Sequence, residues 1–192
     1  MTTEQDLTDD ALMAGAAQGR TVCFRELFVR YRSPVFNYHW RMCGDFQRAE
    51  DLTQETFLAA YRAREGYAPN ARFRAWLFRI ATNLARSAHG ARVREANGLE
   101  ELTRVTKPSA DPPGTARMPD AEQLERKRAV QTALLRLPHE ERAVVVLRHY
   151  RGLKFREIAE VLDIQEATAK SRMRYGLQKL SRWLSSESGE PQ

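Results

Sequence analysis

Two neighbouring segments, residues 48–63 and 72–94, have the apolar spacing of amphipathic helices but polar faces of opposite charge. The apolar residues of the second segment recur every three or four positions, and they are Phe73, Leu77, Ile80, Ala81, Leu84 and Ala88. This spacing predicts an α-helix with one face toward a core. No segment alternates apolar and polar residues as a strand does, so we expect an all-α fold.

A second stripe of the helix at residues 72–94 has no carboxylate and consists of Arg72, Trp76, Arg79, Asn83 and Arg86. Cations neutralise phosphates, a flat ring stacks on an unpaired base, and an amide can read a base edge. These residue types favour contact with an opened nucleic acid. The other interpretation, a solvated basic face with Trp76 turned into the core, explains the stripe equally well.

The helix before it has an acidic face. Its packing stripe is expected at Leu52, Thr56, Phe57, Ala60 and Ala63. The opposite side carries Glu50, Asp51, Gln54, Glu55 and Leu58. Acidic residues near a helix N-terminus are favoured by the helix dipole, which is a sufficient structural explanation. The functional interpretation is a docking face for a basic protein surface.

Composition limits the class of protein. The chain has 192 residues, is 42% hydrophobic and carries a formal net charge of +6. This length allows one domain or two small ones, and a basic excess favours a polyanionic partner. No apolar run is long enough to span a bilayer and the N-terminal residues are acidic and polar, so we expect a cytoplasmic, nucleoid-associated protein without membrane insertion. Cys23 and Cys43 are expected to be buried free thiols, and with no Cys/His cluster of metal spacing we expect no metal and no cofactor.

Turn-forming residues divide the chain into units. Thr8 is expected to cap a first helix, and a longer helix runs from Cys23 to Met42 with a bend or restart at Pro34. The sequence predicts one helical unit over residues 1–95 and a second over residues 121–186. Between them, residues 96–120 are rich in Gly and Pro and predict a flexible linker. Residues 187–192 are expected to form a disordered tail.

The second unit contains two helices joined by a tight turn. Asp163 lies where this turn needs a left-handed residue, and Ile164 is expected to plug the space between the helices. The interior of the last helix is expected to hold Ala169, Met173, Leu177, Leu180 and Leu184. Its outer face carries Thr168, Lys170, Ser171, Arg172, Arg174 and Tyr175. A tight turn before a helix with a basic outer face is typical of a helix-turn-helix, although any helical hairpin resembles one.

Four motifs follow one another along the chain. They are AEDLTQETF from Ala49, FRAWLFRIATN from Phe73, LRLPHEERAVVVLR from Leu135 and KFREIAEVLDIQEATAKSR from Lys154. In this order, with a linker between, they resemble the bacterial extracytoplasmic-function (ECF) sigma factors, the small two-domain group of the sigma-70 family. The resemblance covers residues 7–184. It implies two small helical domains, a sigma2-like bundle and a sigma4-like helix-turn-helix, joined by a flexible linker.

The resemblance implies a promoter-specificity subunit and not an enzyme. The motif that docks on the β′ clamp helices of RNA polymerase in this family is matched by Glu50, Asp51, Gln54, Glu55 and Leu58. Recognition and melting of the minus-ten promoter element would fall to Tyr67, Arg72, Trp76, Arg79, Asn83 and Arg86, with Asn83 at the position that reads an extruded base. Major-groove binding at the minus-thirty-five element would fall to Lys154, Thr168, Lys170, Ser171, Arg172, Arg174 and Tyr175. The implied partners are core polymerase (β′ clamp helices and β flap), promoter DNA and an anti-sigma factor, and the linker would thread through the polymerase core.

Three positions depart from the family pattern. Residues 68–70 read Ala-Pro-Asn where Arg-Gly-Asp or similar is usual, so the identity of the melted base stays open. Lys154 stands where a Ser or Thr cap is usual, and loss of such a cap costs about 0.5–2 kcal/mol. The recognition helix opens with Gln-Glu-Ala-Thr-Ala at residues 165–169, where the family has Pro and Gly-Thr-Val. The sequence therefore does not predict the upstream promoter element.

Three other functions are alternatives to that of a sigma factor. A helix-turn-helix regulator that binds duplex DNA without polymerase explains the second unit but not the adjacent acidic and basic helices. A hydrolase or nuclease needs clustered carboxylates or a His-based acid–base pair, and the dense acids Glu50, Asp51 and Glu55 have no second contributing segment. An adaptor that binds only protein leaves the basic stripe unexplained.

Overall fold

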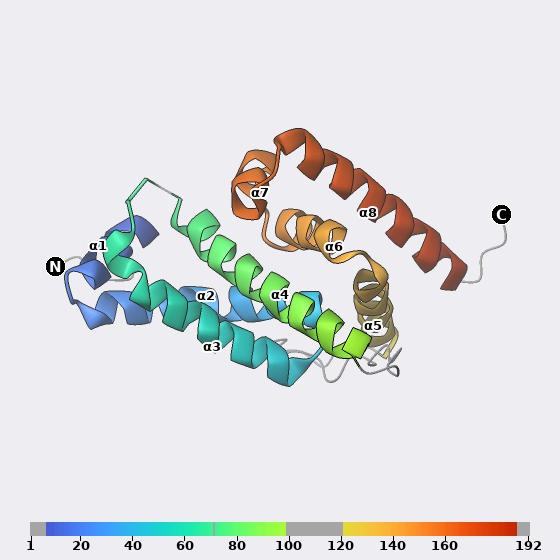
Figure 1. The fold of residues 1–192 in the computed structure, drawn as a ribbon, viewed down its shortest axis with the longest axis horizontal. Helices are drawn as coiled ribbons and strands as arrows, with labels where there is room; N and C mark the ends of the chain where they lie inside the picture. The colour runs from blue at the N-terminus through green and yellow to red at the C-terminus, as the bar shows by residue number, and fades with distance from the viewer. Residues whose placement is uncertain (1–6, 71, 99–120, 188–192) are drawn as a thin grey trace.

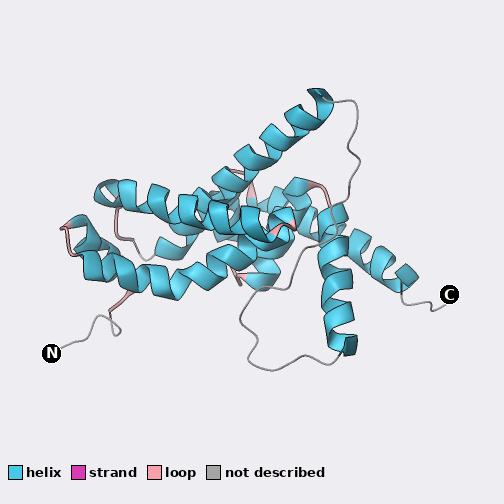
Figure 2. Cartoon of the chain, turned by 90° about the horizontal axis from the view of Figure 1, so that it is seen from below, coloured by secondary structure: helices cyan, strands magenta, loops and turns pink. Residues whose placement is uncertain are grey.

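The computed structural model describes residues 7–70, 72–98 and 121–187. All regular secondary structure in these ranges is helical, which confirms the all-α prediction (Figure 2). None of their helices is long and apolar enough to cross a membrane. The predicted linker lies outside these ranges except for residues 96–98, which continue a helix, and the predicted tail lies outside them except for Glu187.

Four α-helices and a short 3₁₀ turn form the first half of the molecule. They are α1 (Asp9–Ala17), α2 (Thr21–Cys43), α3 (Phe46–Arg62), the 3₁₀ turn Arg64–Gly66 and α4 (Phe73–Gly98). The Thr8 hydroxyl accepts the Ala11 N–H at 3.3 Å, as expected of a cap. Gly44 ends α2 at a φ of 72°, which costs a glycine little. The Asp45 carboxylate then accepts the Arg48 N–H and starts α3.

Helix α2 continues through Pro34, so of the two predicted outcomes, a bend or a restart, the restart is wrong. Proline removes one intrahelical hydrogen bond. The helix is held on both sides of this position by buried residues, among them Leu27, Val35 and Tyr38. The Tyr38 hydroxyl lies 2.9 Å from that of Thr82 in α4, which ties the two helices together. Burial of α2 therefore offsets the lost bond.

The second half consists of α5 (Ala121–Arg136), α6 (His139–Val145), a π-helical segment (Val146–Tyr150), α7 (Phe155–Leu162) and α8 (Glu166–Glu187). Asp163 ends α7 in the left-handed region at a φ of 54°, as predicted, and Ile164 packs against the core. The Lys154 side chain has no hydrogen-bond acceptor, so it cannot cap the N-terminus of α7. The Glu157 carboxylate instead accepts the Lys154 N–H at 2.6 Å, which partly replaces the missing cap.

Three burial predictions were wrong. Leu177 is 46% exposed, and Gly176 takes the interior position of α8. A Cβ on Gly176 would lie 2.9 Å from a methyl group of Val145, so α8 approaches α6 too closely there for a side chain. Ala63 follows the end of α3 and is exposed. Both cysteines are free as expected, but Cys43 is only half-buried.

The two halves pack against each other. Helix α7 lies on α4, and α2 contacts α5, α6 and the π-helical segment (Figure 1). Near this junction a Cβ on Gly44 would lie 2.5 Å from a methyl group of Leu135. The sequence had indicated two units joined by a linker and had not indicated this contact.

Candidate protein and nucleic-acid interfaces

The acidic face of α3 is open to solvent. Asp51, Gln54 and Glu55 are exposed, and Leu58 beside them is 55% exposed. Glu50 is half-buried and forms a long ion pair with Arg32 of α2 at 3.8 Å. The carboxylate of Asp51 accepts a hydrogen bond from Gln47 one turn earlier. An exposed leucine among carboxylates suits a partner that is basic at its rim and apolar at its centre.

The underside of α3 fixes the position of that face. Leu52, Thr56, Phe57 and Ala60 are buried as predicted. The Thr56 hydroxyl donates to the Leu52 carbonyl and lies 2.9 Å from His39 Nε2 of α2. Burial lowers the pKa of His39 to about 3, so this histidine is neutral and serves packing. Helix α3 is therefore held at a defined rotation, with its acids outward.

The basic stripe, which begins at Arg72 just before α4 and continues along this helix, is mostly exposed. Arg72, Arg79, Asn83 and Arg86 are exposed, whereas Trp76 is half-buried. Trp76 packs against the ring of Tyr67 at 5.0 Å between centroids and against Phe73 at 5.8 Å. The indole thus joins an aromatic cluster at the edge of the core and keeps part of its surface accessible, which lies between the two interpretations of the sequence.

Tyr67 precedes α4 and is tied down through its hydroxyl, which donates to the Asp10 carboxylate of α1. Burial, this hydrogen bond and the nearby acids all raise the pKa of Tyr67, so the phenol stays protonated. The ring therefore has a fixed place beside Trp76. Residues 68–70, which depart from the family pattern, are exposed next to it.

Two arginines of the α4 stripe have partners in the second half. Arg72 Nη1 lies 3.1 and 3.0 Å from the two carboxylate oxygens of Glu160 in α7. Arg86 Nη2 donates to the carbonyl of Leu162 at 3.4 Å. Arg79 and Asn83, which lie between them, form no hydrogen bond or ion pair with the residues that the structure describes.

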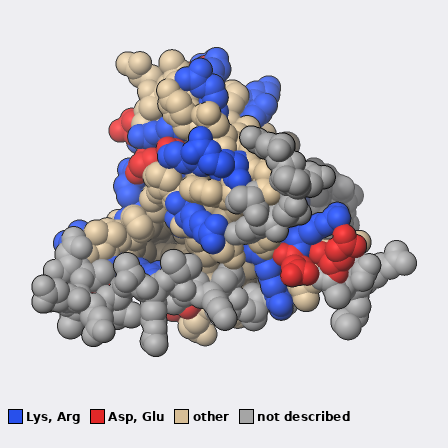
Figure 3. Space-filling view, turned by 90° about the vertical axis from the view of Figure 1, so that its right-hand side faces the viewer, with Lys and Arg blue, Asp and Glu red and all other residues tan. Residues whose placement is uncertain are grey.

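Over most of its outer face, α8 has only short-range partners among the residues that the structure describes. Lys170, Ser171, Arg174 and Tyr175 are exposed. Lys170 pairs with Glu166 one turn earlier at 2.7 Å, and the Arg174 guanidinium lies over the Tyr175 ring. Figure 3 views the end of the molecule that α8 and α5 form, and Lys and Arg side chains spread there from the top to the centre. This face is available to a polyanion.

Two of the predicted α8 residues are less available. Arg172 is half-buried and pairs with Glu140 of α6 at 2.8 Å, and Thr168 is half-buried as well. Arg172 therefore positions α8 on α6 within the second half. Lys154, at the start of α7, is exposed.

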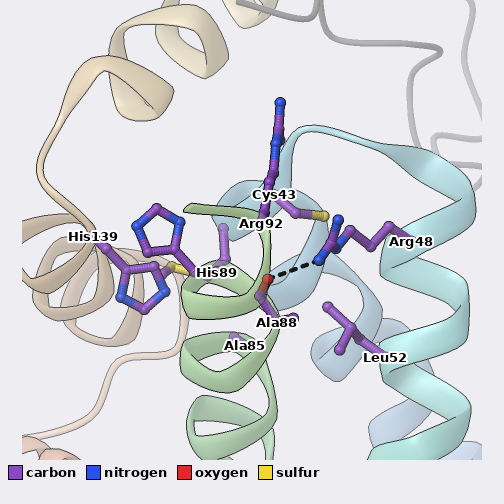
Figure 4. Close-up of a pocket in the computed structure, with 9 residues that line it drawn as sticks. Cys43, Arg48, Leu52, Ala85, Ala88, His89, Arg92 and His139 are labelled. Carbon is purple, nitrogen blue, oxygen red and sulfur yellow. Dashed lines mark hydrogen bonds between the residues drawn. The ribbon is translucent and has the colours of Figure 1, made fainter. Parts of the chain in front are cut away.

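A small pocket lies where the two halves meet (Figure 4). His89 of α4 stacks on His139 of α6 with ring centroids 4.7 Å apart. Burial, together with the smaller effects of His89 and Arg142, lowers the pKa of His139 to about 4. Arg48 closes another side of the pocket by donating to the Ala88 carbonyl. The described residues include no group of three or more Cys, His, Asp or Glu side chains that could hold a metal ion.

Sequence reasoning missed the residues of this junction. Arg142 is buried between the halves and donates to the carbonyls of Met42, Leu135 and Leu137. A signal for Arg142 was available, because it precedes the apolar run Ala143–Leu147, and a charge on a buried face needs partners. Glu160 and His89 gave no such signal, since both lie at positions typical of a solvated helix surface.

Comparison with known proteins places both halves in one family. The Sigma-70 region 2 model matches residues 27–95, and the Sigma-70 region 4 model matches residues 127–180. The ECF RNA polymerase sigma factor SigW of Bacillus subtilis is 32% identical over 177 residues, covering 87% of this chain and 91% of SigW. The chain belongs to the ECF sigma factors.

Solved structures of sigma factors have the same fold. CnrH in complex with the cytosolic domain of CnrY is 28% identical, with a TM-score of 0.70 over 93% of this chain and 97% of CnrH. The sigma factor RpoE in complex with the anti-sigma factor NepR from Bartonella quintana has a TM-score of 0.72 at 21% identity and covers 84% of this chain and 96% of RpoE. As an ECF sigma factor, the protein is a promoter-specificity subunit of RNA polymerase, and the regulator that acts without polymerase is not favoured.

Proposed function

We propose that residues 1–95 bind core polymerase through α3 and the minus-ten strand through α4, and that residues 121–186 bind the minus-thirty-five element through α8. The proposal rests chiefly on one observation. Most acidic residues of α3, Arg79 and Asn83 on α4, and the outer face of α8 are exposed, and each of these helices also has a buried face that holds it in place. Exposed charge of the right sign is what each partner requires.

The chemistry on α4 suits opened DNA. A single strand loses the stacking that its bases had in the duplex, and an aromatic side chain replaces roughly 1–3 kcal/mol of it per base. Trp76 offers a partly accessible ring held in place by Tyr67. Asn83, seven residues further along the helix, offers an exposed amide. Such a site stabilises the melted strand without catalysing a reaction, as expected of a subunit that is not itself an enzyme.

Two partners follow from the family and the surface. The carboxylates Asp51 and Glu55 beside Leu58 are the proposed contact with the β′ clamp helices, and an anti-sigma factor is the proposed regulator. Both would meet the protein in the cytoplasm, where polymerase acts.

Reversing Asp51 and Glu55 to Lys tests the core contact. We expect association with core polymerase in a pull-down or a fluorescence titration to weaken by an order of magnitude or more, because two attractive pairs become repulsive. The helix content and the melting temperature should stay near those of the wild type, because both side chains are exposed. A matched control reverses Glu122 and Glu125 on the exposed surface of α5. Equal affinity of both variants for core polymerase would remove the assignment.

A further inference from the structure

Four nitrogen-bearing side chains line the small pocket between the two halves. Arg48 comes from α3, His89 and Arg92 from α4, and His139 from α6 (Figure 4). The other lining residues are apolar apart from Cys43, and no described lining residue carries a carboxylate. The cavity measures about 30 Å³. A single water needs roughly 10–15 Å³, so a small polar ligand has room to enter.

Several polar atoms around the pocket have unused hydrogen-bonding capacity. The His139 side chain is only 8% exposed, and its Nε2 has no partner among the residues that the structure describes. Leaving a buried polar atom unpaired costs free energy, so this nitrogen favours a ligand that pairs with it. Arg48 donates to the Ala88 carbonyl through Nη2, and its guanidinium has further N–H groups. Arg92 is exposed and forms no hydrogen bond or ion pair with a described residue.

The surroundings of the two histidines are electropositive. Burial is the largest cause of their lowered pKa values, and cationic neighbours act in the same direction. The titratable groups packed around them are Cys43, Arg48, Arg86, Arg92, Glu140 and Arg142. Burial raises the pKa of the Cys43 thiol, so it adds no negative charge, and Glu140 already pairs with Arg172 of α8. The surplus of positive charge therefore keeps both imidazoles neutral when no anion is bound.

A tetrahedral oxyanion has the properties that this pocket requires. Its oxygens accept hydrogen bonds, and guanidinium groups bind it with two-point geometry. The donors come from three helices, so four oxygens at the corners of a tetrahedron reach them better than the two oxygens of a planar carboxylate. A metal ion is repelled by the same arginines, and the described residues include no group of three or more metal-binding side chains.

We propose that this pocket binds a phosphate group, either free or on a small phosphorylated molecule, through Arg48, Arg92 and His139. A bound phosphate accepts a hydrogen bond from His139 Nε2–H and stabilises the protonated form of that ring. His89, which stacks on it at 4.7 Å between centroids, gains the same attraction. Binding therefore takes up protons at a pH below about 6.5, where the ligand-free histidines of this pocket stay neutral. Because both halves supply walls, an occupied pocket also stabilises their packing by mass action.

The test is titration calorimetry of the full chain with inorganic phosphate and, in a second arm, with a nucleoside diphosphate, at constant ionic strength. Arg92→Met removes one cation of the pocket at an exposed position, so the fold should survive. Arg94→Met is the matched control, because Arg94 is exposed on the same helix and does not line the pocket. We expect saturable binding that Arg92→Met weakens on the order of 10-fold, whereas Arg94→Met should stay within about twofold of the wild type.

Proton uptake supplies a second readout. Sulfate keeps a constant charge near neutral pH, so as a probe it separates protonation of the protein from protonation of the ligand. We expect the affinity for sulfate to rise as the pH falls from about 7.5 to about 5.5. Calorimetry in two buffers with different heats of ionisation should show protons taken up on binding. His139→Gln should remove most of both effects, whereas His149→Gln, at an exposed position, should keep them.

The two arms also identify the source of the phosphate group. Tighter binding of the nucleoside diphosphate than of inorganic phosphate would support a nucleotide site, and equal or weaker binding would support a site for free phosphate. If neither anion binds saturably, or if Arg92→Met and Arg94→Met bind both anions alike, the pocket is not an anion site and the proposal is overturned.

Discussion

Helices α4 and α8 both present basic faces with an aromatic residue, yet their surroundings differ. On α8, the exposed Lys170 and Arg174 interact only with residues of their own helix, as far as the described part of the chain is concerned. On α4, Arg72 and Arg86 are engaged by α7, a segment more than 75 positions away in the sequence. The comparison teaches that a charged stripe indicates what a face can bind, whereas the packing of the rest of the chain decides when it is accessible.

The largest effect is expected at the junction that places α7 on α4. Arg142→Met keeps a long apolar side chain but leaves the carbonyls of Met42, Leu135 and Leu137 without their donor. The free energy of unfolding, measured in guanidinium chloride, should fall by about 2–4 kcal/mol. Arg128→Met, on the exposed surface of α5, is the control and should change it little. Similar losses in both variants would mean that the junction does not stabilise the fold.

Asn83→Ala tests the uncovered section of α4. Thermal stability and core binding should stay nearly intact, because the Asn83 side chain is exposed and has no partner among the residues that the structure describes. Affinity for a single-stranded minus-ten oligonucleotide and open-complex formation should fall on the order of 10–100-fold, the value of an amide that reads a base edge. A promoter with a pre-opened bubble should recover only part of this loss, since base capture stays impaired. Wild-type permanganate footprints together with wild-type strand affinity would show that Asn83 is a solvated helix residue.

Arg174→Ala and Lys170→Ala test the open face of α8. If Arg174 binds a base edge with two hydrogen bonds, its loss should cost about 1–3 kcal/mol at the preferred upstream element and relax selectivity there. Lys170→Ala should weaken binding to all upstream sequences alike and lower the salt dependence by about one counterion. Holoenzyme binding at several salt concentrations distinguishes these results. Uniform effects of both variants on every upstream sequence would exclude base reading by this face.

The smallest effect is expected from pH, at the histidine pair between the halves. In the closed arrangement, in which the two halves pack against each other, the pKa of His139 is about 4, and that of His89 is lowered as well, mainly by burial. When the halves are apart or the chain is unfolded, these histidines bind protons below a pH of about 6.5. In the closed arrangement His139 binds a proton only near pH 4. The free energy that holds the two halves together should therefore decrease as the pH falls from 6.5 toward 4. At pH 5.5 the decrease due to His139 is about 1 kcal/mol.

The radius of gyration, measured by solution scattering across this pH range, tests the role of the histidine pair. The charged neighbours Arg86, Arg142 and Glu140 are kept as in the wild type. His139→Gln should flatten the pH dependence of the radius of gyration. His149→Gln, at an exposed position of the π-helical segment, should leave it as in wild type. An identical pH dependence in all three proteins would assign it to other groups.

The sequence by itself determined the helices and the family. Apolar spacing, the Thr8 cap and the left-handed Asp163 act within a few residues, and such local preferences can be read directly from the chain. The four motifs were enough to indicate an ECF sigma factor. The acidic face of α3 and the exposure of Asn83 also followed from helical periodicity.

Only the tertiary structure decided which parts of these faces are free. The pairing of Arg72 with Glu160 spans 88 positions, and no periodic pattern links them. Likewise, Gly176 is buried and Leu177 exposed because α8 approaches α6 at Val145, a distance that no local spacing specifies. Helical periodicity gives the direction of a side chain relative to its own axis. What meets that side chain depends on how the helices pack, and this packing depends on the sum of contacts across the whole molecule.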